Sequence, residues 1–148
     1  MFGEEEIKGI TQIKLDEKGR MKLPKFTKAE SGEEVALMYN IEQTKIVVMK
    51  IQEFEDKLAC LAQRVEELYK ERKIDYKTRI RYQRYIYGEC CLEPPIPVTS
   101  GERITIPKRA IRKLNLKDQV YCVGNESRLD IYPNEESYIL SMSKKRNV

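Results

Sequence analysis

Residues 14–24, KLDEKGRMKLP, decide how this chain of 148 residues folds, because residues 97–107, PVTSGERITIP, repeat their pattern. In both stretches a short turn that contains glycine leads to an arginine, then to two apolar residues separated by a polar one, and then to proline. The two arginines, Arg20 and Arg103, are 83 residues apart. Similarity at a fixed spacing indicates an internal duplication.

The duplication extends beyond these stretches. Further matches are Leu23 with Ile106, Pro24 with Pro107, Val35 with Val120, Ile46 with Leu129 and Val48 with Ile131. The match of Val35 with Val120 requires two extra residues in the second copy. The length suits a single domain. We therefore expect one domain over 1–148, which consists of a first half (8–50), an insert (51–90), a second half (96–135) and a C-terminal tail (136–148) that frays from Ser141.

Each half reads as the same series of elements. Apolar and polar residues alternate over 13–16 and again over 20–23, and the turn between them contains Gly19. This pattern predicts a β-hairpin, with glycine available for a positive φ. The second half predicts the same hairpin around a turn of Ser100, Gly101 and Glu102.

A short helix and two strands complete each half. Pro24 and Pro107 suit the first turn of a helix. Apolar strands are expected over 35–39 and 45–50 in the first half, and near Val120 and Leu129 in the second. Two such halves bury each other's apolar faces. The expected fold is therefore mixed α+β and β-rich, with a pseudo-two-fold axis.

The insert has a different pattern. Its apolar residues follow alternating spacings of three and four: Ile51, Phe54, Leu58, Leu61, Val65 and Leu68. This spacing predicts an amphipathic helix, which either caps the chain's own core or forms a seam between subunits, and we expect core packing. Residues 73–75 break the helix, a second helix runs from Tyr76 to a C-cap at Gly88, and Pro94, Pro95 and Pro97 stiffen the connection that follows.

Composition excludes several kinds of chemistry. The chain has no His, which removes the usual general base and a common metal ligand. Its four cysteines show no Cys-x-x-Cys spacing, and we expect Cys90 and Cys91 to be small buried hydrophobes. We expect no metal site, no cofactor, no membrane association and no small-molecule substrate, and a cytoplasmic protein with reduced thiols. An enzyme would have to assemble carboxylates such as Asp16, Glu17 and Glu102 around a metal, and their spacing does not single them out.

Cations gather on the outer face of the predicted hairpins. Alternation places Met21 and Leu23 inward and therefore places Lys14, Asp16, Arg20 and Lys22 outward. A two-stranded ribbon fits the major groove of DNA, where Arg binds guanine and Lys neutralises phosphate. The alternative is an ordinary solvated face with a surface ion pair. The candidate DNA-binding residues are Lys14, Asp16, Lys18, Arg20, Lys22, Arg103 and Arg109.

A second basic stretch lies in the insert. Residues 64–84 contain eight cations and four anions, a net charge of +4, and tyrosines are interleaved with them. Basic and aromatic residues in this arrangement bind nucleic acid by charge and stacking. The same residue types are also typical of packing and subunit contacts, which we expect here.

The chain resembles the MraZ family, bacterial transcription factors built from two SpoVT-AbrB halves. The resemblance rests on Met1–Glu4 (MFGE), on residues 15–20 (LDEKGR) followed by Leu23-Pro24, on residues 79–88 (RIRYQRYIYG) and on residues 103–107 (RITIP). It implies an AbrB-like, double-split β-barrel with an inserted helix pair, a ring-shaped homo-oligomer associated with the nucleoid, and binding to short direct repeats in double-stranded DNA upstream of a division and cell-wall gene cluster.

Residue by residue, the resemblance gives Asp16 and Arg20 the family's role in reading DNA. The second half departs from the motif, because Thr99 stands where the family has Asp and Glu102 where it has Gly. We expect a sequence-specific DNA-binding regulator without catalysis. The alternatives are an interaction or ring-assembly module that has lost operator binding, and an antitoxin-like relative, for which the segment after Pro133 is short.

Overall fold

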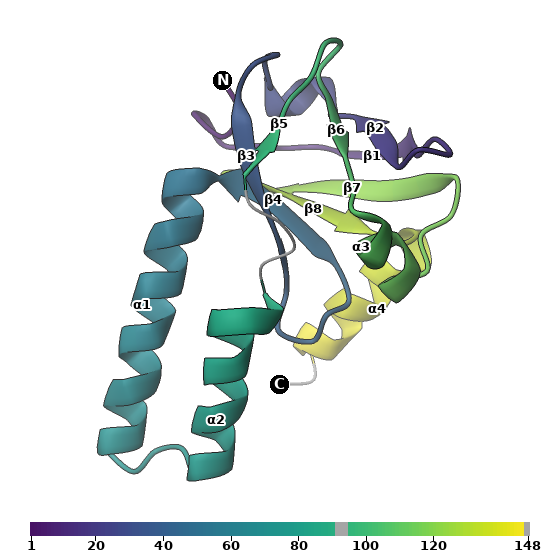
Figure 1. Ribbon diagram of the computed structural model, residues 1–148. Coiled ribbons are helices and arrows are strands. Elements are labelled where there is room, and N and C mark those ends of the chain that lie inside the picture. Colours follow the sequence, from purple (N-terminus) through teal and green to yellow (C-terminus); the bar gives the residue numbers. More distant parts are fainter. Residues whose placement is uncertain (91–94, 147–148) are drawn as a thin grey trace.

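The computed structural model describes residues 1–90 and 95–146 and has a mixed α+β architecture (Figure 1). The strands are β1 (Ile10–Lys14), β2 (Arg20–Lys22), β3 (Glu34–Tyr39), β4 (Ile46–Lys50), β5 (Ile96–Pro97), β6 (Arg103–Thr105), β7 (Gln119–Asn125) and β8 (Arg128–Tyr132). The helices are the 3-10 helix η1 (Lys25–Thr27), α1 (Ile51–Lys70), α2 (Tyr76–Arg84), the π-helix η2 (Tyr85–Glu89), α3 (Lys108–Lys113) and α4 (Glu135–Arg146).

The strands form two antiparallel sheets in which the halves of the chain interleave. One sheet has six strands in the order β1-β7-β8-β4-β3-β5, and the other is the two-stranded ribbon β2-β6. The six-stranded sheet is open, since β1 and β5 at its edges do not pair with each other. The corresponding strands of the two halves are β1 and β5, β2 and β6, β3 and β7, and β4 and β8. When each strand is exchanged for its counterpart, the order of the large sheet is the same, read from the opposite edge.

The register of the strands follows the duplication. In the ribbon, Met21 lies opposite Ile104, its own counterpart at the spacing of 83 residues. In the six-stranded sheet, Val47 lies opposite Asp130, which is again its counterpart. A pseudo-two-fold axis therefore passes through these two pairs, and each half completes the sheet of the other.

The two hairpins predicted from the sequence are replaced by pairing between the halves. β1 pairs with β7, and β2 pairs with β6. Within each expected hairpin a single isolated bridge remains, Leu15 to Met21 in the first half and Thr99 to Arg103 in the second. The alternation of apolar and polar residues was read correctly, but it is the same in both halves and does not distinguish pairing within a half from pairing between halves.

The large sheet has a core on each face. On β3, Val35, Leu37 and Tyr39 face the ribbon side, whereas Ala36 and Met38 face the helix pair. Burial on both faces explains why residues 35–39 are continuously apolar rather than alternating. The sheet is thus the middle layer between the β2-β6 ribbon and α1 with α2 (Figure 1).

The helix pair packs on its own chain, as expected from the sequence. α1 contributes Phe54, Leu58, Leu61 and Val65 to the second core. Asp75 caps α2, because its side chain accepts a hydrogen bond from the backbone N–H of Thr78 at 2.7 Å. The end of the helix pair at which residues 71–75 connect α1 to α2 lies away from the sheet (Figure 1).

Two expectations about helix ends were wrong. Gly88 does not cap α2, because the chain continues as the π-helix η2, which buries Tyr85 and Ile86 against the sheet. Residues 141–146, which were expected to fray, continue the helix α4, and residues 147–148 lie outside the described residues. Asn134 accepts a hydrogen bond from the Ser137 N–H at 2.8 Å, and Tyr138 packs its ring on two tyrosines of the sheet. Pro94 and Cys91 lie outside the described residues.

Candidate nucleic-acid interface

The β2-β6 ribbon brings cations from both halves onto one surface. Arg20 lies opposite Thr105, and Lys22 lies opposite Arg103. All four side chains are exposed, while the residues between them, Met21 and Ile104, are buried in the core. The ribbon is three residue pairs long, about 10 Å at the rise of an extended strand, and the major groove is about 12 Å wide.

The turn before β2 is organised by Asp16. One carboxylate oxygen, Oδ1, accepts hydrogen bonds from the backbone N–H groups of Lys18 and Arg20, at 2.9 and 2.8 Å. The other, Oδ2, accepts from Nε of Arg20 at 2.8 Å. The hydrogen bond from the Arg20 backbone N–H is the main reason that the pKa of Asp16 lies below its usual range. The carboxylate therefore shapes the turn and orients the Arg20 guanidinium, whose terminal nitrogens make no hydrogen bond within the described part of the chain.

The turn before β6 is built differently. Thr99 pairs with Arg103 through a backbone hydrogen bond of 2.8 Å, and its hydroxyl donates to the Arg103 carbonyl at 3.2 Å. Glu102 adopts a left-handed φ of 54°, next to Gly101 at 79°. Within the described residues no hydrogen bond joins the Thr99 hydroxyl to the Arg103 guanidinium, so the two arginines are held in different ways.

Both turns also meet the opposite strand. The Ile106 N–H donates to the Gly19 carbonyl at 2.7 Å, and the Leu23 N–H donates to the Glu102 carbonyl at 2.8 Å. The turn of each half is therefore anchored to the strand of the other half.

The remaining predicted residues are more dispersed. Lys18 is exposed in the Asp16 turn, and Lys14 is exposed on β1, where it lies opposite Gln119 of β7. Arg109 is exposed on α3, close enough to Tyr39 for its charge to oppose the rise that burial causes in the pKa of that phenol. The structure thus groups Arg20, Lys22 and Arg103 on the ribbon.

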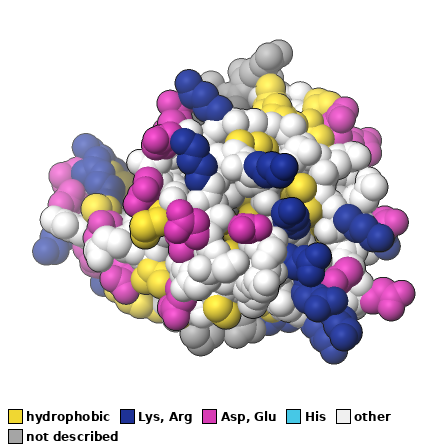
Figure 2. Space-filling model, turned by 90° about the horizontal axis from the view of Figure 1, so that it is seen from above, with side chains coloured by type: hydrophobic (Ala, Val, Ile, Leu, Met, Phe, Trp, Pro, Cys, Tyr) yellow, Lys and Arg dark blue, Asp and Glu magenta, His cyan; other side chains and the backbone are white. Residues whose placement is uncertain are grey.

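Seen from the side on which β2 and β6 lie, Lys and Arg side chains cross the surface in a broken band, with Asp and Glu side chains beside it (Figure 2). Lys and Arg side chains thus gather on this surface, although acidic side chains lie among them. Such a surface attracts a polyanion in a salt-dependent way.

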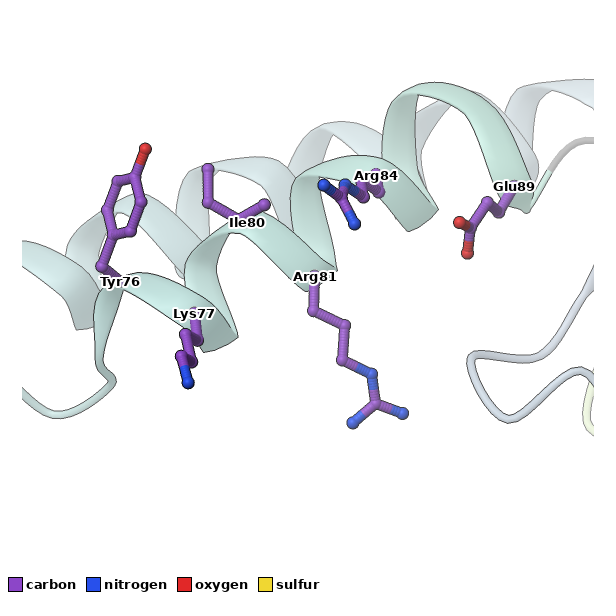
Figure 3. Close-up of a pocket in the computed structure, with 6 residues that line it drawn as sticks. All are labelled: Tyr76, Lys77, Ile80, Arg81, Arg84 and Glu89. Atoms are coloured by element: carbon purple, nitrogen blue, oxygen red, sulfur yellow. The ribbon is translucent and has the colours of Figure 1, made fainter.

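A second basic surface lies on α2. Tyr76, Ile80 and Arg84 lie along one side of the helix, and Lys77 and Arg81 point to the other side (Figure 3). With Glu89 they line a shallow groove of about 380 Å³. Tyr69 and Arg79 face the neighbouring helix instead, because the Arg79 guanidinium stacks 4.5 Å from the Tyr69 ring centre and its Nε donates to Glu66 at 3.1 Å. The basic and aromatic residues of the insert therefore divide between packing and an exposed surface.

The cysteines, the acidic side chains and the helices bear on the remaining expectations, about thiols, metal ions and membranes. Cys90 and Cys122 are buried, and Cys60 is exposed. In the described ranges, no three Cys, Asp or Glu side chains are grouped so that they hold a metal ion. The helices of the same ranges are too short or too polar to cross a membrane.

Sequence reasoning missed one charged cluster, on the helix side of the large sheet. Lys45 forms an ion pair of 2.9 Å with Asp130, and both side chains are largely buried. The signal was present in the alignment of the two halves, because Asp130 stands where the first half has the apolar Val47. A charge at a core position marks a local departure from the duplication.

Comparison of the chain with protein-family models finds no match, and comparison with curated proteins finds none either.

Proposed function

We propose that this chain is a sequence-specific DNA-binding transcriptional regulator that reads the major groove with the β2-β6 ribbon. The observation that carries the proposal is the register of the ribbon, which sets Arg20, Lys22 and Arg103 side by side above a buried face. Arg20 is the main base-reading residue, since Asp16 holds its guanidinium in one orientation. Lys22, Lys18 and Lys14 neutralise phosphates on either side of the groove.

The same proposal includes a particular fold, the AbrB-like double-split β-barrel. The pairing of β2 with β6 and of β4 with β8, each with its counterpart in the other half, supports an AbrB-like double-split barrel of the MraZ type. In that arrangement several copies form a ring, and their ribbons contact short direct repeats upstream of a division and cell-wall gene cluster. Linking weak sites on a rigid ring raises avidity by about 10²- to 10⁴-fold where the spacing of the repeats fits.

The proposal is tested by fluorescence anisotropy on a duplex from the region upstream of the protein's own gene and on a scrambled duplex. The proteins are the wild type, Arg20→Ala, Arg103→Ala and the control Arg81→Ala, which removes one exposed charge from α2. The wild type and the control are expected to prefer the upstream duplex more than about tenfold, and Arg20→Ala to lose that preference. Affinity is expected to fall steeply from about 50 to about 200 mM salt.

Equal and weak binding of both duplexes by all four proteins contradicts operator binding in that region. It would favour the alternative function, an interaction or ring-assembly module with the same fold. The exposed basic face of α2 supports that alternative, because it presents Tyr76, Lys77 and Arg81 without covering another element of the described chain (Figure 3).

A further inference from the structure

A cavity of about 360 Å³ lies on the face of the large sheet opposite the ribbon. Its walls come from the sheet, from α1 and from the α2–η2 segment, and they include Met38, Ile41 and Leu61 on one hand and Lys45, Lys57 and Asp130 on the other. A volume of this size, with apolar walls and a few charged groups, is typical of a site for a small molecule.

Asp130, in the wall of this cavity, has one carboxylate oxygen that accepts no hydrogen bond from the described residues. Its side chain is 4% exposed, and Oδ2 accepts hydrogen bonds from Lys45 at 2.9 Å and from Asn125 at 3.2 Å. Oδ1 is buried and has no hydrogen-bond donor among the described residues. A buried carboxylate oxygen without a donor is costly, so this position favours a ligand that brings a donor.

Two cationic groups in the walls of the same cavity, Nε of Arg128 and the ammonium group of Lys57, donate no hydrogen bond to the described residues. Nε of Arg128 is buried without a hydrogen bond, although the guanidinium forms ion pairs with Glu53, 3.6 Å from Nε, and with Glu126, 3.1 Å from Nη2. Lys57 projects from α1 and has no hydrogen bond or ion pair within the described part of the chain. Burial, followed by the charges of Arg128 and Lys45, lowers the pKa of Lys57, while the charges of Asp130 and Glu53 oppose this shift, so the ammonium group is held at a net cost. An anionic group beside Lys57 lowers that cost.

We propose that this cavity binds a small amphipathic carboxylic acid that carries a hydrogen-bond donor next to its carboxylate, the chemistry of an apolar α-amino acid or α-hydroxy acid. The carboxylate binds Lys57 and Arg128, the adjacent donor binds Oδ1 of Asp130, and the apolar part contacts Met38, Ile41 and Leu61. The site lies across the sheet from the ribbon and does not depend on DNA binding.

Calorimetric titration of the full chain with three matched probes tests this proposal. The probes are L-leucine, 2-hydroxy-4-methylpentanoate and 4-methylpentanoate, which share a carbon skeleton and differ in the donor. Leucine or the hydroxy acid is expected to bind at least about tenfold more tightly than 4-methylpentanoate, which lacks the donor. Tighter binding of leucine than of the hydroxy acid identifies the amino acid as the ligand class, and the reverse order identifies the hydroxy acid.

Two variants locate the site. Lys57→Met is expected to weaken binding of the preferred probe about tenfold or more, whereas Lys70→Met, which removes an exposed lysine from the same helix, leaves it unchanged. Lys57→Met should unfold no earlier than the wild type, because it removes an unpaired, partly buried charge. No binding of any probe at up to about 10 mM, equal binding of 4-methylpentanoate, or equal binding by Lys57→Met overturns the proposal.

Discussion

At the scale of single residues, Asp16 does two things with one carboxylate. Oδ1 accepts the two backbone hydrogen bonds that close the turn, and Oδ2 holds Nε of Arg20. The side chain that shapes the backbone thus also orients the proposed base-reading group. An alanine at this position would loosen both the turn and the guanidinium.

The ionisation of Asp16 makes part of the stability depend on pH. Hydrogen bonds, first from the Arg20 backbone N–H and then from the Arg20 side chain and the Lys18 N–H, lower its pKa below the ordinary value of 3.8. A carboxyl whose folded-state pKa is depressed contributes stability above its unfolded pKa and loses it as the pH falls through the folded pKa. The difference in unfolding free energy between the wild type and Asp16→Ala should therefore shrink as the pH is lowered from 7 toward about 2.5.

Urea unfolding at a series of pH values measures this difference. Asp16→Asn is the matched control, because its amide oxygen still accepts hydrogen bonds but does not titrate. The stability difference between Asp16→Asn and Asp16→Ala should stay constant over the same range. A gap between wild type and Asp16→Ala that is independent of pH would show that the charge of Asp16 does not contribute.

Gly19 is required for two reasons that a pair of variants separates. Its φ is 81°, and a Cβ would lie 2.9 Å from the carbonyl oxygen of Ile106 in the other half. Gly32 has a similar φ of 94° but no atom within 4 Å of a Cβ. Gly19→Ala should cost about 1–3 kcal/mol more in unfolding free energy than Gly32→Ala, because only the former also meets the opposite strand. Equal losses in urea unfolding would mean that the approach of the two halves at Gly19 is not tight.

At the scale of elements, much of the secondary structure could be predicted. The spacing of Phe54, Leu58, Leu61 and Val65 predicted α1, and all four side chains pack on the sheet. The pairing of strands could not be predicted, since Ile13 suits β7 of the second half as well as its own hairpin. The choice depends on burying both halves in one core, which is a property of the whole chain.

The candidate site could likewise be predicted only in part. The sequence predicted that Arg20 and Lys22 point outward, because the alternating residues Met21 and Leu23 are buried. The position of Lys22 opposite Arg103 could not be predicted, because it depends on the pairing of strands from different halves. The sequence led to two separate hairpins, each with its own arginine, where the structure has one ribbon.

α4 was missed because its sequence lacks a clear apolar face, and its attachment depends on aromatic contacts. The ring of Tyr138 lies 5.6 Å from that of Tyr121 and 5.2 Å from that of Tyr132. Tyr138→Ala should lower the unfolding free energy by about 1 kcal/mol and reduce the protection of α4 amides from hydrogen exchange. Ile139→Ala is the control, because Ile139 is 52% exposed on the same helix. Unchanged protection in Tyr138→Ala would mean that other contacts hold α4.

At the scale of the whole molecule, the large sheet that both halves build has a different proposed role on each face. The strands shared by the halves bury one core under the ribbon and a second under α1 and α2. The ribbon face presents the proposed DNA-reading residues, and the helix face contains the charged cavity. Because both halves contribute strands to each sheet, neither half is expected to fold or to bind DNA without the other.

The most direct test of the central claim, that both halves read DNA through one ribbon, is amide NMR mapping of the full chain with the upstream duplex. We predict the largest shift changes together in Asp16–Lys22 and Arg103–Thr105, with small changes in α2. Changes confined to α2, or to one half of the ribbon, would contradict the claim.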